Sequence, residues 1–361
     1  MTYLLGIETS CDETSAAVLE VRTPEPHAAR LRSNIVASQV DLHRRYGGVV
    51  PELASRRHLE RLGPVIDEAL DAAGVALQEI GAVAVTCGPG LAGALTVGVA
   101  AAKALAFAGG RPLIGVNHLE GHIYANLLEH PDLPLPAVVL IVSGAHTDLL
   151  VMADHGRYAI LGRTRDDAAG EAFDKAARAL GLGYPGGPAI DGEARKGKAH
   201  RVALPRPFPD ETSYDFSFSG LKTAVLRTVA RMSHGATPPR DTEHTTAPWV
   251  ADVAAAFQDA LVEVLVAKTI RAARALGVRS ILLAGGVAAN SALRARLETA
   301  AQGLGVPLFL PSLSLCTDNA GMIAAAAAYH LARGERSSLG LGAYADLDLT
   351  EPVPETSICN D

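Results

Sequence analysis

The chain contains the same plan twice: an apolar strand, a polar tip and a second apolar strand. In the first copy a strand over residues 3–10 runs into a turn at 11–15, and a strand resumes at 16–21. In the second copy the strands cover 137–142 and 149–152, and the turn covers 143–148. One β-hairpin of this kind in each half predicts a duplicated architecture. We expect two lobes whose polar tips point into one cleft.

Helical patterns alternate with buried strands through the rest of the chain. Further strands are predicted at 82–86, 112–116, 280–284 and 307–310, and helices at 53–73, 92–108, 166–182, 250–276 and 320–332. This alternation predicts an α/β fold in which helices cover mixed sheets. Three prolines between 131 and 136 place a boundary there. We therefore expect an N-terminal lobe over 1–130, completed by about 320–345, a C-terminal lobe over 131–319, and a loose tail over 346–361.

Composition narrows the classes of function. The chain has 361 residues, enough for two domains, and a net charge of −7, which argues against a free-standing nucleic-acid binder but allows a local basic patch. Four widely spaced cysteines without a Cys-x-x-Cys pair indicate reduced thiols, and no leader is visible, so a cytoplasmic location is expected. The apolar region 91–108 contains Gly93, Gly98 and Lys103, which favours a buried helix over a membrane span.

A pair of histidines indicates a metal site. His118 and His122 are four residues apart, so on a helix both imidazoles lie on one face and can reach one ion. Asp318 is the best distant candidate for a third ligand, although it also fits a cap of the helix that follows. Two histidines, one carboxylate and open positions suit Fe(II), and zinc tolerates them. Glu120 falls at the wrong offset for the general base of a zinc peptidase.

Other segments are candidates for binding anions. The first tip carries Asp12 and Glu13 beside hydroxyl groups, and it is either a holder of phosphate or of metal-bound phosphate, or an ordinary polar hairpin. A Gly-Gly pair at 285–286 follows a strand and opens a helix, where a flat anionic ligand can approach the backbone.

Two basic stretches form either a patch for RNA phosphates or a solvated surface. One is the helix face with Arg56, Arg57, His58 and Arg61, and the other covers residues 192–210.

Eight motifs, in order along the chain, resemble the TsaD family, the tRNA N6-adenosine threonylcarbamoyltransferases, once labelled sialoglycoprotein endopeptidases. They lie at 7–14, 117–122, 143–147, 170–175, 184–188, 218–223, 285–290 and 317–319. The resemblance implies the actin/Hsp70/sugar-kinase (ASKHA) fold, with two lobes around a nucleotide cleft. It implies an acyltransferase that moves the threonylcarbamoyl group from threonylcarbamoyl-AMP to N6 of adenosine 37 in tRNAs that read ANN codons. The products are the modified nucleoside t6A and AMP.

The resemblance also assigns residues and partners. It implies one divalent metal, iron favoured and zinc possible, on His118, His122 and Asp318. The silent paralogue TsaB and the P-loop ATPase TsaE are the implied protein partners. The residues that it assigns to the adenylate are Ile141, Val142, Ser143, Gly144, Ala145, Asp174, Gly187, Asp191 and Asn290.

Two points stay open at the level of sequence. Ala145 stands where the family has a second glycine, and it would be strained by about 1 kcal/mol if its φ were positive. Asp12 or Glu13 either accepts the proton of the adenosine amine or only shapes the hairpin. A small-molecule kinase on the same fold, a nucleotide-sensing module and a peptidase are the rival classes of function.

Overall fold

The computed structural model describes residues 2–22, 25–206, 212–233 and 247–358. Residues 207–210 of the second basic stretch and Cys359 lie outside this part of the chain. The three cysteines within it, Cys11, Cys87 and Cys316, form no disulfide with one another. The chain divides into two compact units. The first contains residues 1–133, 155–157 and 311–361, and the second contains 134–154 and 158–310.

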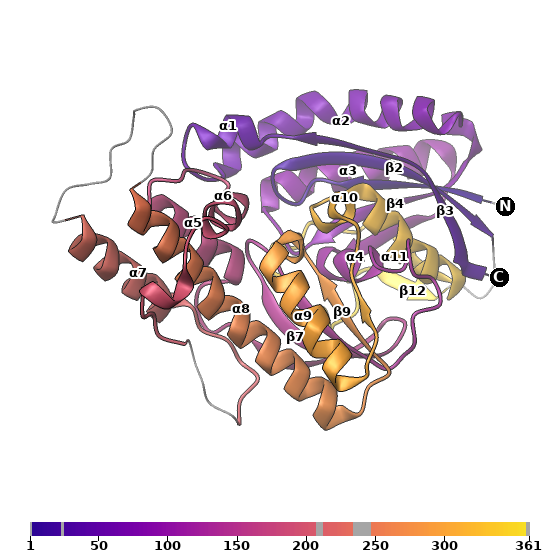
Figure 1. Cartoon of the computed structure of the whole chain (residues 1–361). Coiled ribbons are helices and arrows are strands. Elements are labelled where there is room, and N and C mark those ends of the chain that lie inside the picture. The colour runs from indigo at the N-terminus through magenta and orange to yellow at the C-terminus, as the bar shows by residue number, and fades with distance from the viewer. Residues whose placement is uncertain (1, 23–24, 207–211, 234–246, 359–361) are drawn as a thin grey trace. The chain divides into compact units, whose positions relative to one another are not determined.

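The first unit is built on a mixed sheet that begins with the predicted hairpin. The hairpin strands β1 and β2 are antiparallel, and β4 and β5 run parallel to β1 (Figure 1). The strands across the sheet are, in order, β12 (Thr356–Ile358), β11 (Glu335–Ser337), β5 (Leu113–Asn117), β4 (Ile80–Gly88), β1 (Thr2–Glu8), β2 (Glu13–Arg22) and β3 (Glu25–Ser38).

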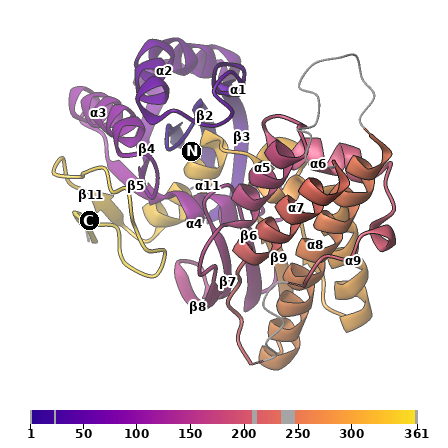
Figure 2. The same ribbon diagram turned by 90° about the vertical axis from the view of Figure 1, so that its left-hand side faces the viewer.

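Helices cover both faces of this sheet. Side chains alternate along β1, so Leu5 and Ile7 join the core beneath two long helices, α2 and α3, which lie next to each other in Figure 2. Gly6 faces the opposite side, where a Cβ would lie 2.5 Å from the carbonyl oxygen of Ala320 in α11. The helices of this unit are α1 (Val40–Arg44), α2 (Pro51–Ala73), η1 (Leu77–Glu79), α3 (Ala92–Gly109), α4 (His118–Tyr124), α10 (Leu313–Cys316) and α11 (Ala320–Ala332).

The second unit repeats the strand order of the first. The order β5-β4-β1-β2-β3 of the first sheet corresponds to β10-β9-β6-β7-β8 in the second. In both sheets the two hairpin strands are antiparallel. The strand on the other side of the first hairpin strand, β4 beside β1 and β9 beside β6, runs parallel to it. The duplicated architecture predicted from the two hairpins is therefore confirmed. The strands are β6 (Ala137–Val142), β7 (Thr147–Asp154), β8 (Arg157–Arg163), β9 (Ser280–Ala284) and β10 (Leu308–Phe309).

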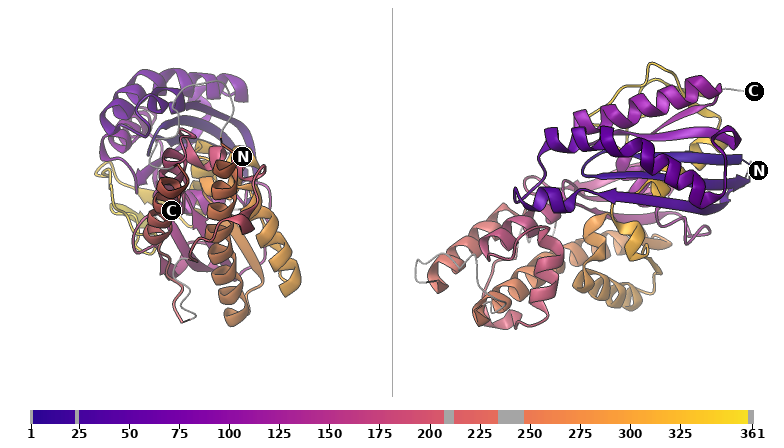
Figure 3. Two further views of the ribbon diagram at one scale, coloured as in Figure 1. Left: turned by 60° about the vertical axis from the view of Figure 1, so that its left-hand side comes forward. Right: turned by 90° about the horizontal axis from the view of Figure 1, so that it is seen from above.

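Helices of the second unit pack on one another as well as on its sheet. α5, α6, α7 and α8 form a group of neighbouring helices (Figures 2 and 3). Gly285, with φ of 91°, turns the chain from β9 into η3, a conformation that favours glycine. The helices are α5 (Ala169–Ala179), α6 (Gly186–Ala194), η2 (Ala199–Arg201), α7 (Ser219–Met232), α8 (Pro248–Leu276), η3 (Gly286–Ala289) and α9 (Ser291–Leu304).

The structure corrects the prediction of a loose tail. Within 346–361, Leu347 and Leu349 are buried, and Leu347 belongs to the core beside α2 and α3. Strand β12 then pairs with β11 at one end of the sheet. The described part of 346–361 is therefore packed on the first unit, because its leucines cover apolar surface that the helices leave open.

Among the described residues, α3 is the one helix that is long and apolar enough to cross a membrane. It is packed in the first unit against β4 and α2, and residues such as Leu95, Val99 and Ala102 are buried there. A core helix of this composition meets the same criteria of length and hydropathy as a membrane span. The helix predicted at 92–108 is thus present, with one face in the core.

Candidate functional site

The two histidines lie where a strand passes directly into a short buried helix. β5 ends at Asn117, whose side chain accepts a hydrogen bond from the backbone N–H of Leu119 at 2.9 Å and so caps α4. His118 and His122 follow on one face of α4, one turn apart, and their ring centroids are 4.7 Å from each other. Every residue of α4 is buried, so both imidazoles are fixed by packing.

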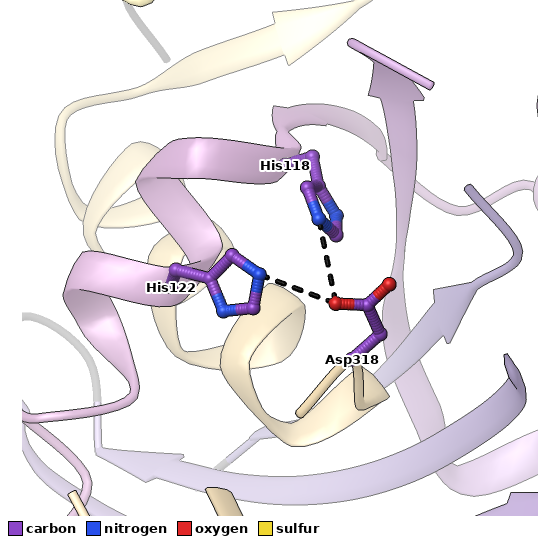
Figure 4. Close-up of side chains that lie close together, drawn as sticks. All are labelled: His118, His122 and Asp318. Carbon is purple, nitrogen blue, oxygen red and sulfur yellow. Dashed lines mark ion pairs between the residues drawn. The ribbon is translucent and has the colours of Figure 1, made fainter. Parts of the chain in front are cut away.

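Asp318 completes the cluster from the segment between α10 and α11. Its Oδ1 lies 3.5 Å from Nε2 of His118 and 3.2 Å from Nε2 of His122 (Figure 4). The N-cap of α11 is Asn319, which accepts a hydrogen bond from the backbone N–H of Met322 at 3.0 Å. Asp318 is therefore not the capping residue, and its carboxylate faces the histidines instead. The predicted convergence of the three side chains is confirmed, with their ligand atoms within 4.8 Å of one another.

The residues present fit a divalent metal ion. The imidazole of His122 is 1% exposed, and neither of its nitrogens has a hydrogen-bond partner among the described residues. The contact of its Nε2 with Asp318 therefore lacks hydrogen-bond geometry. Buried polar atoms are nearly always satisfied, so an orphaned imidazole requires an explanation. A cation shared with His118 and Asp318 would supply the missing interaction, and this donor set suits iron or zinc.

The charge balance of the site depends on a glutamate that the sequence did not single out. Glu8, at the end of β1, is fully buried, and its Oε2 lies 3.1 Å from Nδ1 of His118. Burial alone would lower the pKa of His118, but the carboxylates of Asp318 and Glu8 outweigh it and raise that pKa to about 9. Burial alone would raise the pKa of Glu8, but the charge and hydrogen bond of His118 lower it.

The first hairpin tip lies in the same unit as the metal cluster. Asp12 is buried, and Glu13 accepts a hydrogen bond from Oγ of Ser38 at 3.0 Å. Burial, together with the neighbouring carboxylates of Asp12 and Asp318, raises the pKa of Glu13 to about 9. The pair of Asp12 and Glu13 therefore holds a proton near neutral pH.

His58 is not part of the basic face that was predicted on α2. It is fully buried, its Nδ1 lies 2.8 Å from Oγ1 of Thr14, and its Nε2 lies 3.0 Å from the carbonyl oxygen of Cys11. The reason is helical spacing, since His58 is four residues from both Ala54 and Leu62, which are buried. Its function is to hold the first hairpin tip against α2.

The second hairpin tip presents backbone rather than side chains. Ile141 and Val142 are fully buried residues of β6, so only their backbone groups can meet a ligand. Gly144 and Ala145 are exposed. Glu355 is the one non-glycine residue with positive φ in the described ranges, so Ala145 adopts an ordinary negative φ and carries no strain. The oxygen of Ser143 accepts the backbone N–H of Gly170 at 3.0 Å, which ties the tip to the start of α5.

The remaining predicted adenylate residues lie in the second unit. Three of them, Asp174, Asp191 and Asn290, form hydrogen bonds that join helices or cap them. Asp174 accepts the backbone N–H of Gly186 at 2.6 Å, which joins α5 to α6. Asp191 accepts Oγ–H of Ser291 at 2.7 Å, which joins α6 to α9. A Cβ on Gly187 would meet no atom within 4 Å, so space remains beside that backbone.

Asn290 caps α9 by accepting the N–H of Leu293 at 2.9 Å, and it donates a hydrogen bond to Gln258 at 2.8 Å. Gln258 and Ser291 were missed at the sequence level, because their contacts join elements that are far apart in the chain.

The comparisons with known proteins decide the family. The family model for TsaD, tRNA N6-adenosine threonylcarbamoyltransferase, matches residues 30–325. The chain belongs to the TsaD family. It is 55% identical to the tRNA N6-adenosine threonylcarbamoyltransferase of Moorella thermoacetica, over 96% of this chain and 97% of the relative. It is 58% identical to the one of Symbiobacterium thermophilum, over 96% of each. The resemblance read from the motifs is confirmed, and with it the class of enzyme, a transferase that modifies tRNA.

Solved structures support the fold of this TsaD-family chain. HypF from T. kodakarensis is similar with a TM-score of 0.58 at 14% identity, covering 91% of this chain and 48% of that one. The full-length HypF structure in its phosphate- and nucleotide-bound form gives a TM-score of 0.55, covering 91% of this chain and 46% of that one. At this identity the likeness concerns the fold alone. Together with the repeated strand order, it confirms the predicted α/β ASKHA fold.

The basic stretches of this TsaD-family chain are largely neutralised by ion pairs. In the second stretch, four cations pair with carboxylates at 2.5–3.2 Å, and in α2 both Arg56 and Arg57 have glutamate partners. This pairing lowers the positive charge that each stretch presents to RNA. Their use as tRNA contacts stays a prediction. The pairs in the second stretch are Arg195–Asp191, Lys196–Glu193, Arg201–Asp252 and Arg206–Asp259.

Proposed function

We propose that this chain transfers the threonylcarbamoyl group of threonylcarbamoyl-AMP to N6 of adenosine 37 in tRNAs that read ANN codons. In this reaction N6 forms a bond to the carbamoyl carbon, the bond from that carbon to the phosphate oxygen breaks, and AMP leaves with the electron pair. The observation that carries the proposal is the cluster of two buried histidines, His118 and His122, with the partly exposed Asp318 in a chain of this family. The adenosine amine is a weak nucleophile, so orientation and charge stabilisation are expected to supply most of the acceleration.

The metal cluster is proposed to hold one divalent ion, Fe(II) by preference or zinc. When bound, such an ion supplies Lewis-acid stabilisation of developing negative charge on a phosphate or carbonyl oxygen. His118 and His122 would bind through Nε2, since these are the atoms that face Asp318. The short helix α4 has no exposed residue, so it presents the two imidazoles in a fixed arrangement and limits the access of water from its own side.

The adenylate is proposed to bind to the second unit. The backbone of 141–145, with exposed Gly144 and Ala145, offers N–H groups without bulky side chains. Asp174, Asp191 and Asn290 lie at junctions between helices, where their hydrogen bonds hold the surrounding backbone in place. The open space beside Gly187 leaves room for a flat ligand.

The proton released from the adenosine amine requires an acceptor. Burial and the neighbouring carboxylates raise the pKa of Glu13, which shares a hydrogen bond with Asp12, so the pair holds a proton near neutral pH. One carboxylate of the Asp12–Glu13 pair is then available as the general base. The alternative is that Asp12 and Glu13 are purely structural. In that case the two carboxyl groups share a hydrogen bond and shape the hairpin tip.

Partners and a location are proposed together with the reaction. TsaB, the silent paralogue, and TsaE, the P-loop ATPase, are proposed to work with this chain on tRNA. The proposed location is the cytoplasm, and no membrane partner is proposed. These assignments rest on membership of the TsaD family.

The direct test mixes the protein with both partners, threonylcarbamoyl-AMP and unmodified ANN-reading tRNA, and then weighs the nucleosides of the digested tRNA. We expect threonylcarbamoyl-adenosine from the wild type. His118→Ala and His122→Ala should lose both bound metal and product, because each removes one of three ligands. His27→Ala is the matched control, since His27 lies on β3, away from the metal helix, and should leave product unchanged.

Product formation by metal-free His118→Ala protein would contradict the metal function. No product from the wild type, combined with steady ATP hydrolysis by the protein alone, would instead favour a kinase or a nucleotide sensor.

A further inference from the structure

We propose that Glu8 is a positioning residue for His118, accepting the Nδ1 proton of its imidazole and so aiming Nε2 at the metal. The inference rests on the metal site proposed above and adds a fourth side chain to it. Metal-binding histidines commonly donate their second ring N–H to a carboxylate, which fixes the orientation of the ring. In this chain, Oε2 of Glu8 lies 3.1 Å from Nδ1 of His118, while Nε2 of the same ring faces Asp318.

Glu8 is itself held on both oxygens. Oε1 accepts the backbone N–H of Ser10 at 2.5 Å, and Oε2 accepts the hydroxyl of Thr86 at 2.5 Å. The side chain is fully buried, and Thr86 comes from β4, the strand parallel to β1. A carboxylate fixed by two donors from two segments cannot follow the imidazole if that ring turns. It therefore gives His118 one preferred orientation.

Ser10 is the competing partner for the same nitrogen. Its Oγ lies 3.2 Å from Nδ1 of His118, close to the distance of Glu8. A hydroxyl can donate or accept, so Ser10 alone would allow either tautomer of the imidazole. A carboxylate that already receives two hydrogen bonds acts only as an acceptor, and it requires the proton on Nδ1. The geometry therefore assigns the control of the tautomer to Glu8 rather than to Ser10.

The two histidines would then differ in how they are held. Nδ1 of His122 has no hydrogen-bond partner among the described residues, so its orientation depends on packing in α4 and on the metal. Loss of the Glu8 contact should consequently affect His118 and leave His122 in place. This asymmetry is specific to the proposal and can be measured without turnover.

The first experiment measures zinc affinity by competition with a chromophoric chelator at pH 7.5. For Glu8→Gln we expect zinc to bind about 10–100-fold more weakly than to the wild type, because the amide cannot satisfy all three donors. Ser10→Ala keeps the Glu8 contact, and we expect its affinity to stay within about threefold of the wild type. Glu120→Gln is the matched control, because it neutralises a second buried carboxylate, one that lies on α4 and pairs with His330.

The second experiment records 15N spectra of histidine-labelled, zinc-loaded protein, with His118 assigned through His118→Gln. Protonated Nδ1 and metal-bound Nε2 on His118 would support the proposal. Zinc on Nδ1, or a proton on Nε2, would overturn it. This measurement uses wild-type protein, so it decides the question even if Glu8→Gln does not fold.

The affinities separate the remaining outcomes. Unchanged zinc affinity in Glu8→Gln, or equal losses in Glu8→Gln and Glu120→Gln, would overturn the function of Glu8 while leaving the metal site intact. A tenfold loss in Ser10→Ala would assign the contact to Ser10 instead. Failure of the wild type to bind zinc or Fe(II) would remove the proposed metal site and this inference with it.

Discussion

Among single residues, the helix that carries the proposed metal ligands, α4, also takes part in a second charged cluster. Glu120, between the two histidines in sequence, points to α11, where its Oε2 lies 2.7 Å from Nε2 of His330. Glu335 contacts the other ring nitrogen of His330 and also pairs with Arg333 at 2.6 Å. This arrangement explains why Glu120 is unavailable as a general base. It also links α4 to the C-terminal end of α11.

This cluster predicts a pH dependence of stability. Burial would lower the pKa of His330, but Glu120 and Glu335 outweigh it and raise that pKa to about 9, above its ordinary value of 6.5. The folded state therefore binds more protons than the unfolded state between these values, and stability falls as pH rises through this window. The contribution is fully present below pH 6.5 and amounts to about 1–3 kcal/mol, which is lost by about pH 9.

The measurement compares urea unfolding of the wild type and His330→Gln at pH 6 and pH 9.5, with a chelator present. The wild type should be the more stable at pH 6, and the difference should shrink strongly at pH 9.5. A difference of equal size at both pH values would show that His330 acts through packing alone.

At the scale of elements, the position of α11 depends on one glycine of β1. A Cβ on Gly6 would lie 2.5 Å from the carbonyl oxygen of Ala320 and 3.0 Å from Cβ of Ala324. Backbone atoms cannot rotate away, so the helix would have to move from the sheet. Asp318 lies just before α11, and a shift of the helix start would therefore carry the third metal ligand with it.

Gly6→Ala is therefore expected to destabilise the fold by about 1–3 kcal/mol and to weaken zinc binding, because overpacking displaces α11. Gly303→Ala is the matched control. Gly303 lies on the exposed side of α9, and a Cβ there would meet no atom within 4 Å, so alanine should stabilise that helix by about 0.5–1 kcal/mol. Thermal unfolding measures the stability of both variants, and zinc titration measures their metal affinity. Equal stability and equal zinc affinity in the two variants would show that Gly6 does not control the position of α11.

The convergence of the three proposed ligands could be predicted because their signal is local. The spacing of His118 and His122 places them on one helix face, and Asp318 stands in a short motif. Glu8 could not be assigned in this way, because its contact with His118 joins residues that lie 110 positions apart in the chain. His58 was misassigned for the same kind of reason: its charge type indicates a surface, while its partners Thr14 and Cys11 lie on another element.

At the scale of the whole molecule, the duplicated plan was the most informative signal in the sequence. Two hairpins with polar tips predicted two sheets of one topology, and the structure has the same strand order in both units. The third strand of each sheet, β3 in the first unit and β8 in the second, extends that repeat. Period-two alternation and apolar runs determine such strands locally, which is why the fold class was predictable.

The C-terminal segment was not predictable, and it offers the clearest test of how the first unit is completed. Its apolar residues Leu341, Leu347 and Leu349 are separated by Gly, Tyr and Asp without helical or strand periodicity, so no local pattern indicated burial. Leu341 is fully buried beside α3, whereas Leu339, two residues earlier, is 48% exposed. The two leucines thus form a matched pair within one segment.

Leu341→Ala should lower the free energy of unfolding by about 2–5 kcal/mol, since it opens a cavity between the segment and the core. Leu339→Ala should change it by less than about 0.5 kcal/mol, because its side chain already meets water. Chemical denaturation of both variants measures the difference. Equal, small effects would mean that the segment around Leu341 contributes little to the core of the first unit. A large effect at Leu341 alone would establish that the segment belongs to the core of the first unit, next to the strand that leads into the metal helix.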